Sequence, residues 1–189
     1  MNLPNKLTVL RMALIPFFVI AMMWESLPFH HFWGLLIFVA ASLTDMLDGK
    51  IARKYNLITD FGKFMDPLAD KLLVTAAMVM FVELGAVPAW VVILILAREF
   101  LVTSLRTLAA GKGVVIAADK WGKFKTISQM IWLILGILLL ACVQDLGMTG
   151  SLIAAGGALF TLLTVVVVAL TLFSGWNYMW HNRSVYADK

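Results

Sequence analysis

Residues 152–173 read LIAAGGALFTLLTVVVVALTLF, an uncharged apolar run that decides the fold class of this chain. A helix needs about 20 mostly apolar residues to cross a hydrocarbon layer about 30 Å thick. The rest of the chain repeats this pattern, because 62% of its 189 residues are hydrophobic and only 14% are charged. Soluble domains are nearer about one half apolar and one quarter charged. The sequence therefore excludes an ordinary soluble protein and predicts an integral membrane protein.

The apolar runs predict an all-α fold with six transmembrane helices. These helices use most of the chain and leave no room for a soluble domain, so residues 1–189 are expected to form a single membrane domain. The spans, each placed to within about four residues at its ends, are predicted at residues 7–24, 33–53, 64–84, 88–110, 122–145 and 150–175.

The distribution of Lys and Arg predicts how these helices are oriented. All 15 lie on one side of the predicted bundle or in the nearer half of a helix, and the opposite connections, around residues 25–31, 83–88 and 144–150, contain none. Short loops rich in Lys and Arg stay in the cytoplasm, so both termini are expected to face it.

An N-terminus without a signal cleavage site or transit peptide favours a bacterial inner (cytoplasmic) membrane over an organelle. On the outer side, His30 and His31 are expected to be solvated loop residues rather than ligands.

Four acidic residues crowd into one stretch near the predicted cytoplasmic surface: Asp45, Asp48, Asp66 and Asp70. The first two are three residues apart and the last two are four apart, so each pair shares a helix face. An ionisable group inside the membrane costs several kcal/mol unless it meets a cavity, a partner or an ion. Divalent cations with oxygen ligands relieve the repulsion between such pairs, and the spacing therefore favours a metal site. The alternative is four independent carboxylates that pair with nearby basic residues.

The same aspartates belong to a longer pattern, Asp45-x2-Asp48-Gly49-x2-Ala52-Arg53-x8-Gly62-x3-Asp66-x3-Asp70. This pattern resembles the full signature of the CDP-alcohol phosphatidyltransferase family, whose members are six-helix membrane proteins and often dimers. The family transfers a phosphatidyl or phosphoalcohol group from a CDP-linked donor, and the resemblance implies CDP-diacylglycerol as the donor of this chain. All eight signature positions are present, so the resemblance is specific.

The resemblance implies roles for the signature residues. Two divalent ions, Mg²⁺ or Mn²⁺, would be held by the four aspartates, and Asp70 would also act as the general base. The nucleotide end of the donor would lie near Gly49, Ala52, Arg53 and Gly62. Metals that bridge the pyrophosphate oxygens cancel the charge that repels an incoming hydroxyl and stabilise the CMP leaving group. We expect direct in-line transfer without a covalent enzyme intermediate.

Basic residues near the predicted cytoplasmic surface narrow the choice of acceptor. Lys123 and Lys125 lie in a Gly-Lys-Phe-Lys-Thr segment at the start of a helix, where unpaired N–H groups favour a phosphate dianion. Arg98 lies well inside the membrane, and Arg106 lies about two turns closer to the cytoplasm. A pairing of Arg98 with Glu99 that holds the bundle together explains Arg98 about as well as a functional role.

Three segments outside the signature, residues 4–11, 97–106 and 122–126, resemble the subgroup of the family that makes phosphatidylglycerophosphate. The resemblance implies sn-glycerol 3-phosphate as acceptor, with its primary hydroxyl directed at Asp70 and its phosphate in a cationic pocket. Thr8 shares a helix face with Arg11, but a helix cap and an interfacial anchor explain these two about as well. The residues expected to form the pocket are Arg106, Lys123 and Lys125, followed by Arg98 and Arg11.

Other acceptors, a cation transporter and a membrane scaffold without chemistry are the alternatives, and the scaffold leaves the costly aspartates unexplained. The other acceptors in the family are phosphatidylglycerol, which gives cardiolipin, inositol phosphate, and serine, which would not need a cationic cluster. A six-helix bundle with intramembrane acids could also be a cation transporter, although its outer half has almost no polar residues to continue a path. The net charge of +4 is distributed along a membrane surface, so the expected partners are membrane lipids, the two substrates and a second copy of the chain, not nucleic acid.

Overall fold

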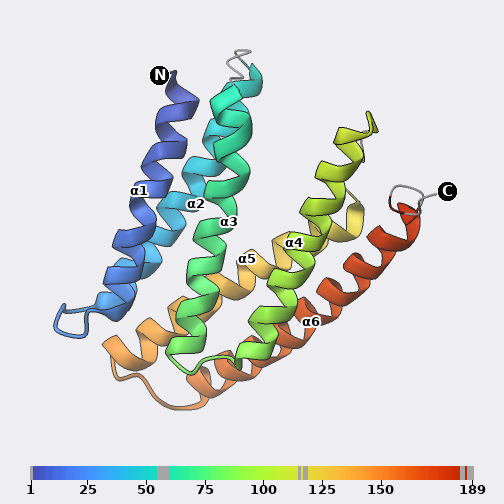
Figure 1. Ribbon diagram of the computed structural model, residues 1–189. Helices are drawn as coiled ribbons and strands as arrows, with labels where there is room; N and C mark the ends of the chain where they lie inside the picture. The colour runs from blue at the N-terminus through green and yellow to red at the C-terminus, as the bar shows by residue number, and fades with distance from the viewer. Residues whose placement is uncertain (1, 55–59, 115, 117–118, 184–185, 187–189) are drawn as a thin grey trace.

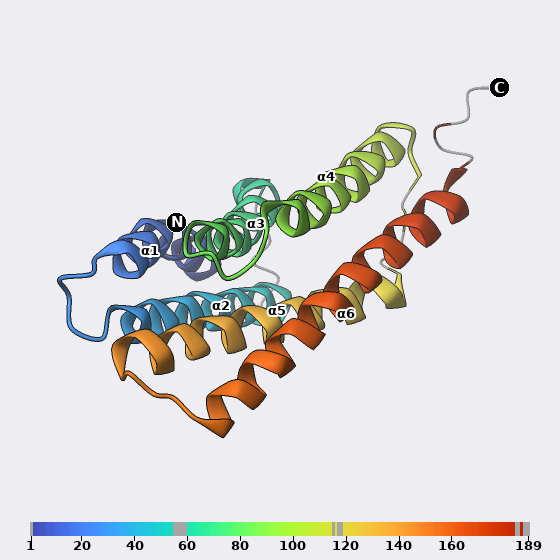
Figure 2. The ribbon, with the colours of Figure 1, turned by 90° about the horizontal axis from the view of Figure 1, so that it is seen from below.

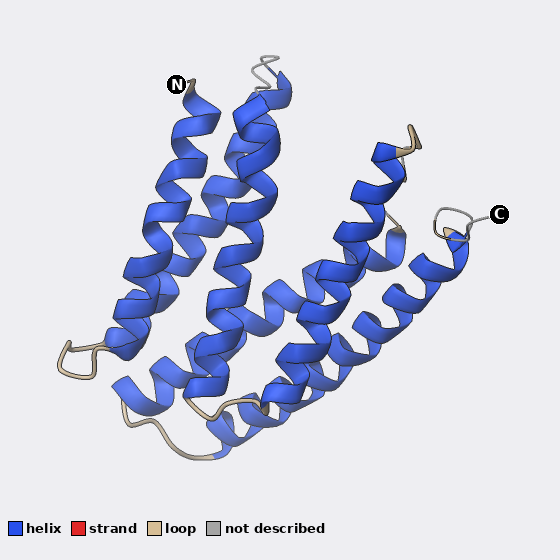
Figure 3. Ribbon diagram, in the orientation of Figure 1, coloured by secondary structure: helices blue, strands red, loops and turns tan. Residues whose placement is uncertain are grey.

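The computed structural model describes residues 2–54, 60–114, 116, 119–183 and 186. These residues form six α-helices and one short π-helix, and no strand occurs among them (Figure 3), which confirms the predicted all-α fold. The elements are α1 (Leu3–Met23), α2 (His30–Lys54), α3 (Asp60–Glu83), α4 (Ala89–Gly111), α5 (Lys120–Leu140), the π-helix η1 (Ala141–Asp145) and α6 (Ser151–His181).

Each helix coincides with a predicted span, and most of the differences lie at the ends. The last span was predicted to end at residue 175, but α6 continues to His181. No proline interrupts this helix, and its final turns carry the exposed rings of Trp176 and Trp180. Tryptophan is enriched where a membrane helix leaves the hydrocarbon layer. The final turns of α6 therefore have the composition expected beyond the apolar run.

Among the described residues, three helical segments are long and apolar enough to cross a membrane: Asn5–Met23, Lys120–Asp145 and Ser151–His181. They correspond to α1, to α5 with η1, and to α6. In α4 the apolar run contains three charged residues, Arg98, Glu99 and Arg106, and parts of α2 and α3 have side chains outside the described residues. Large apolar side chains are exposed on the outside of all six helices of the described chain. A surface of this kind indicates a membrane protein, because lipid covers it at no hydrophobic cost.

Consecutive helices run in opposite directions, so the bundle has two ends (Figure 1). We call the end that holds Asn2 and His181 the terminal end, and the end that holds residues 24–29, 84–88 and 146–150 the far end. Helix α1 packs against α2 and α3, whereas α6 packs against α4 and α5, and α5 also contacts α2 (Figures 1 and 2). Helix α5 therefore joins the two groups.

An aromatic cluster fixes α3, α5 and α6 together. The ring of Trp132 meets Phe81 edge-on at 5.4 Å and stacks on Phe160 at 5.7 Å between ring centroids. Its Nε1 donates a hydrogen bond of 2.8 Å to Thr164 Oγ1, which satisfies the buried indole. A Cβ at Gly136 would lie 2.4 Å from Phe81, so only glycine allows this approach. Most of the apolar core lies toward the far end, and the polar residues are left to the terminal end.

Candidate active site

A cavity of about 690 Å³ is present in the terminal half of the bundle, and α2 to α6 all contribute to its wall. The acidic side chains of Asp45, Asp66 and Asp70 line one part of it, from α2 and α3. Basic side chains from α3, α4 and α5 line the remainder: Lys71, Arg98, Arg106 and Lys123. The fold thus brings three of the four predicted carboxylates and three of the predicted phosphate-binding residues to one cavity. A site with both charges can bind metal ions and phosphate groups together.

Helix α1 holds two of the carboxylates. Thr8 Oγ1 donates a hydrogen bond of 2.6 Å to Asp66 Oδ1, and Arg11 Nη1 lies 2.6 Å from Asp45 Oδ1. Both α1 side chains are fully buried. Such contacts orient carboxylates in the way that outer-shell partners orient metal ligands. The sequence left open a cap, an interfacial anchor or, for Arg11, a phosphate-binding role, and the structure places this helix face against the acids.

The described aspartates offer suitable donors for a divalent ion. Asp45 is half-buried with 42% of its side chain exposed, and Asp66 is half-buried while Asp70 is exposed. Carboxylate oxygens on a cavity wall are the ligands that Mg²⁺ and Mn²⁺ prefer. The side chains of four signature residues lie outside the described part of the structure: Asp48, Gly49, Ala52 and Arg53. The remaining one, Gly62, is buried in the first turn of α3.

The side chain of Arg98 packs closely against α5 and α6, at a point where each of these helices has a glycine. A Cβ at Gly122 would lie 3.3 Å from Arg98 Nη2, and one at Gly175 would lie 3.0 Å from Arg98 Cγ. The side chain is only 11% exposed and its Nη1 lies 3.0 Å from Glu99 Oε1. The Nε atom is buried with no hydrogen-bond partner among the described residues. Arg98 therefore pairs with Glu99 and also lines the cavity.

Lys125 has a different environment from Lys123. Its side chain is 1% exposed and its Nζ lies 2.6 Å from Glu99 Oε1 and donates at 2.6 Å to Gln129 Oε1. The ammonium group therefore compensates the Glu99 carboxylate between α4 and α5. Lys123, two residues earlier, is exposed and lines the cavity.

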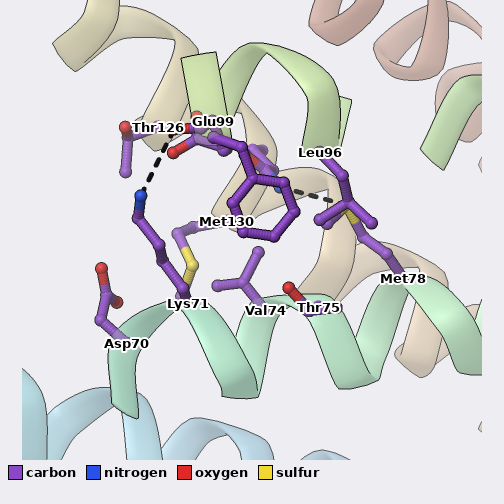
Figure 4. A pocket seen from close by; sticks show the side chains of 11 residues that line it. Asp70, Lys71, Val74, Thr75, Met78, Leu96, Glu99, Thr126 and Met130 are labelled. Carbon is purple, nitrogen blue, oxygen red and sulfur yellow. Dashed lines mark hydrogen bonds between the residues drawn. The ribbon is translucent and has the colours of Figure 1, made fainter. Parts of the chain in front are cut away.

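A smaller pocket of about 80 Å³ adjoins the cavity between α3, α4 and α5 (Figure 4). Asp70 and Lys71 lie at one end of it, and Val74, Met78 and Leu96 continue its wall away from them. Lys71 Nζ donates to the Glu99 carbonyl oxygen at 3.4 Å and also to Thr103 Oγ1. The exposed carboxylate of Asp70 therefore lies where a polar wall meets an apolar one.

Sequence reasoning missed two polar residues at the cavity. Tyr178 of α6 lines it, and its buried hydroxyl has no hydrogen-bond partner among the described residues. Asp119 also lines it, and its Oδ2 accepts a hydrogen bond of 2.9 Å from Asn177 Nδ2. One signal was present in the sequence. The polar pair Asn177-Tyr178 follows the last apolar run, beyond the predicted end of the span at residue 175.

Comparison with known proteins agrees with this arrangement. The family model of the CDP-alcohol phosphatidyltransferases matches residues 1–180. A Bacillus subtilis (strain 168) protein named CDP-diacylglycerol–glycerol-3-phosphate 3-phosphatidyltransferase is 46% identical over 192 residues, which cover 96% of this chain and 95% of the relative. Proteins of the same name are 41% identical in Rickettsia bellii, over 94% of this chain and 93% of the relative, and 45% identical in Haemophilus influenzae, over 69% and 72%. The chain therefore belongs to the CDP-alcohol phosphatidyltransferase family.

Proposed function

We propose that this protein transfers the phosphatidyl group of CDP-diacylglycerol to sn-glycerol 3-phosphate, which gives phosphatidylglycerophosphate and CMP. The observation that carries the proposal is the single cavity in which carboxylates of α2 and α3 face basic side chains of α4 and α5. The names of the relatives, 46% and 41% identical over nearly the whole chain, support the same reaction. It is a step of phospholipid biosynthesis.

Asp45, Asp48, Asp66 and Asp70 would hold two divalent ions, Mg²⁺ or Mn²⁺. Carboxylate oxygens, which these ions prefer as ligands, line the cavity at Asp45, Asp66 and Asp70, and Asp48 is included on the strength of the signature. The bound ions would neutralise the pyrophosphate and stabilise the charge that develops on CMP. Thr8 and Arg11 would keep two of the carboxylates in place through the contacts described above.

Asp70 is the proposed general base. Its exposed carboxylate would accept the proton of the primary hydroxyl of glycerol 3-phosphate as that oxygen attacks the phosphatidyl phosphorus. The bond from phosphorus to the bridging oxygen breaks, and the electron pair leaves with CMP. Attack and departure occur in line, so no covalent intermediate with the protein forms. The proton then passes from Asp70 to water.

Arg106, Lys123 and Arg98 would bind the phosphate of the acceptor. The first two are exposed on the cavity wall, where charged donors can approach a dianion. Arg98 lies deeper and is fixed by Gly122 and Gly175. Arg11 and Lys125 would contribute through Asp45 and Glu99, the carboxylates that they contact.

The donor would lie across the polar and apolar walls. Its nucleotide end would approach Gly49, Ala52, Arg53 and Gly62, as the signature implies. The apolar pocket beside Asp70 supports a place for the lipid end. All six helices would span the inner membrane with both termini and the cavity on the cytoplasmic side, and two chains would form a homodimer.

An acceptor assay tests the proposal. Purified protein is given CDP-diacylglycerol with glycerol 3-phosphate, phosphatidylglycerol, inositol phosphate or serine in turn, and the products are identified by mass spectrometry. We expect phosphatidylglycerophosphate from the first mixture alone, loss of product with EDTA, and recovery with Mg²⁺ or Mn²⁺. A product from another acceptor, or undiminished turnover in EDTA, would contradict the acceptor or the metal assignment respectively.

A further inference from the structure

At the far end of the bundle, the first turn of α2 meets the end of η1 (Figures 1 and 2). His31 Nδ1 lies 2.7 Å from Asp145 Oδ1, and His30 Nε2 lies 3.6 Å from the same oxygen. One ligand atom from each of the three residues lies within 4.8 Å of the others. The sequence had suggested solvated histidines, but the side chains of His31 and Asp145 are fully buried and that of His30 is 13% exposed.

Asp145 carries a buried charge that needs compensation. An ionised carboxylate out of water is costly unless a cation is paired with it. The far-end connections contain no Lys or Arg, and among the described residues the ion-pair partners of Asp145 are the two histidines. The Phe32 N–H donates to Oδ2 at 3.0 Å, which leaves Oδ1 facing both rings. The first turn of α2 supplies part of the compensating positive charge through its N–H groups, and a cation bound between Oδ1 and the two rings would supply the rest.

The presence of two rings favours a cation over a proton. A single protonated histidine would satisfy Oδ1, and the second ring, 3.9 Å from the first between centroids, would then add nothing. Protonating both would place two cations side by side in a buried site. A divalent ion uses both imidazoles in their neutral form, and two histidines with one carboxylate are a common protein ligand set for Zn²⁺, which completes its shell with water.

The distances suit such an ion. Ligands about 2.0–2.1 Å from a tetrahedral Zn²⁺ lie about 3.4 Å from one another. The nitrogen–oxygen distances of 2.7 and 3.6 Å lie on either side of this value. Small rotations of the side chains would bring the ligand atoms to the ion. These rotations would break no hydrogen bond at the opposite ring nitrogens, because His30 Nδ1 and His31 Nε2 have no partner among the described residues.

The backbone at both edges of this cluster is unusual. Phe29, directly before His30, has a φ of 56° and is the only non-glycine residue with positive φ in the described part of the chain. Asp145 ends the π-helical turn η1. Strained residues and π-turns concentrate at functional sites because they re-aim neighbouring side chains. Here they direct the histidines of α2 and the carboxylate of η1 toward one point.

We propose that His30, His31 and Asp145 form a second metal site, specific for a borderline divalent ion such as Zn²⁺, which links α2 to η1 at the far end. Its nitrogen-containing ligand set separates it from the oxygen-rich cavity at the terminal end. Imidazole binds Zn²⁺ or Co²⁺ far better than Mg²⁺. The site therefore stays selective in a large excess of Mg²⁺.

Zn²⁺ titration of the purified full-length protein in excess Mg²⁺ tests the proposal. We expect one Zn²⁺ bound per chain and a rise in Tm. A Co²⁺ derivative should show the intense visible bands of a four-coordinate ion with nitrogen and oxygen ligands. His30→Ala should weaken Zn²⁺ binding by more than about tenfold and abolish the Tm rise. His181→Ala is the matched control, because the third histidine of the chain ends α6, and it should bind as the unmodified protein does.

Asp145→Asn gives a second test, since it keeps the shape of the side chain and removes its charge. Loss of Zn²⁺ binding in this variant supports the site. Absence of Zn²⁺ binding in the unmodified protein, or binding unchanged in both His30→Ala and Asp145→Asn, overturns it and leaves a histidine–carboxylate pair that caps α2. If Asp145→Asn does not fold, His30→Ala still decides. The readouts are metal binding and Tm, so the outcome is independent of the proposed reaction.

Discussion

At the scale of single residues, Asp70 is more exposed than Asp45 and Asp66, the other two described aspartates of the candidate site. It lies at the border between the charged cavity and the apolar pocket, where a lipid-linked donor and a water-soluble acceptor can meet. The neighbouring residue Lys71 is already engaged with Glu99 and Thr103. Asp70 is therefore available to an incoming hydroxyl.

We expect Asp70→Asn to lower kcat by about 10²–10⁴-fold, because the amide neither removes a proton nor ligates a cation as a carboxylate does. The rate of phosphatidylglycerophosphate formation measures the effect. Glu83→Gln is the control, since Glu83 is an exposed acid at the end of α3 near the far end. Near-normal turnover of Asp70→Asn would remove Asp70 from the mechanism.

Arg106→Ala and Lys123→Ala should each raise the KM for glycerol 3-phosphate by about tenfold or more, because each removes a charge-assisted hydrogen bond worth about 1.5–3 kcal/mol. The KM for CDP-diacylglycerol should change little. Lys120→Ala is the matched control, as this exposed lysine begins α5. An unchanged acceptor KM in both variants would refute the proposed phosphate pocket.

At the scale of elements, α1 and the α4–α5 pair act as supports for the cavity. Helix α1 positions two carboxylates on two different helices. Thr8 contacts Asp66 of α3, and Arg11 contacts Asp45 of α2. Between α4 and α5, the Glu99 carboxylate accepts from both Arg98 and Lys125. These contacts fix the acidic wall and the basic wall separately.

Thr8→Val should weaken metal activation rather than substrate binding. The substitution removes the hydroxyl that donates to Asp66 Oδ1 and keeps the shape, and loss of an outer-shell partner typically costs about 10–100-fold in metal affinity. The Mg²⁺ concentration at half-maximal activity should rise, with the acceptor KM unchanged. Thr161→Val is the control, since that exposed hydroxyl donates only within α6. Equal Mg²⁺ dependence in both variants would contradict the positioning role.

Lys125→Met should destabilise the bundle by about 1–3 kcal/mol, because it leaves Glu99 with less compensation. The cost stays below that of a fully buried pair because Glu99 is 27% exposed. Tm measures the loss, and the double variant with Glu99→Gln should recover part of it. Additive losses in the double variant would show that the two side chains do not interact.

At the scale of the whole molecule, the polar cavity and the apolar core occupy opposite halves. The core, with Phe81 and Trp132, lies toward the far end, and the charged residues of the cavity lie toward the terminal end. A membrane protein with this polarity meets its soluble substrate from one side only. The basic residues predict that this side is the cytoplasmic one.

Labelling of single cysteines tests the orientation. In a Cys142→Ala background, which removes the only native cysteine, Arg183→Cys follows α6 and Met148→Cys follows η1. A membrane-impermeant thiol reagent should label Met148→Cys in intact cells, and Arg183→Cys only in inverted vesicles. The reverse pattern would place the cavity on the outer side.

The sequence alone determined the helices, because apolar runs long enough to cross a membrane must form them whatever their neighbours. It also placed the aspartates on shared helix faces and identified the family signature. The partners of Thr8, Lys125 and His31 could not be read in this way. Their contacts join residues 58, 26 and 114 positions apart, and such pairings depend on which helix faces pack together, a property that no local pattern encodes. Tertiary structure therefore decided which basic residues face the cavity, and that the outer histidines are buried against Asp145.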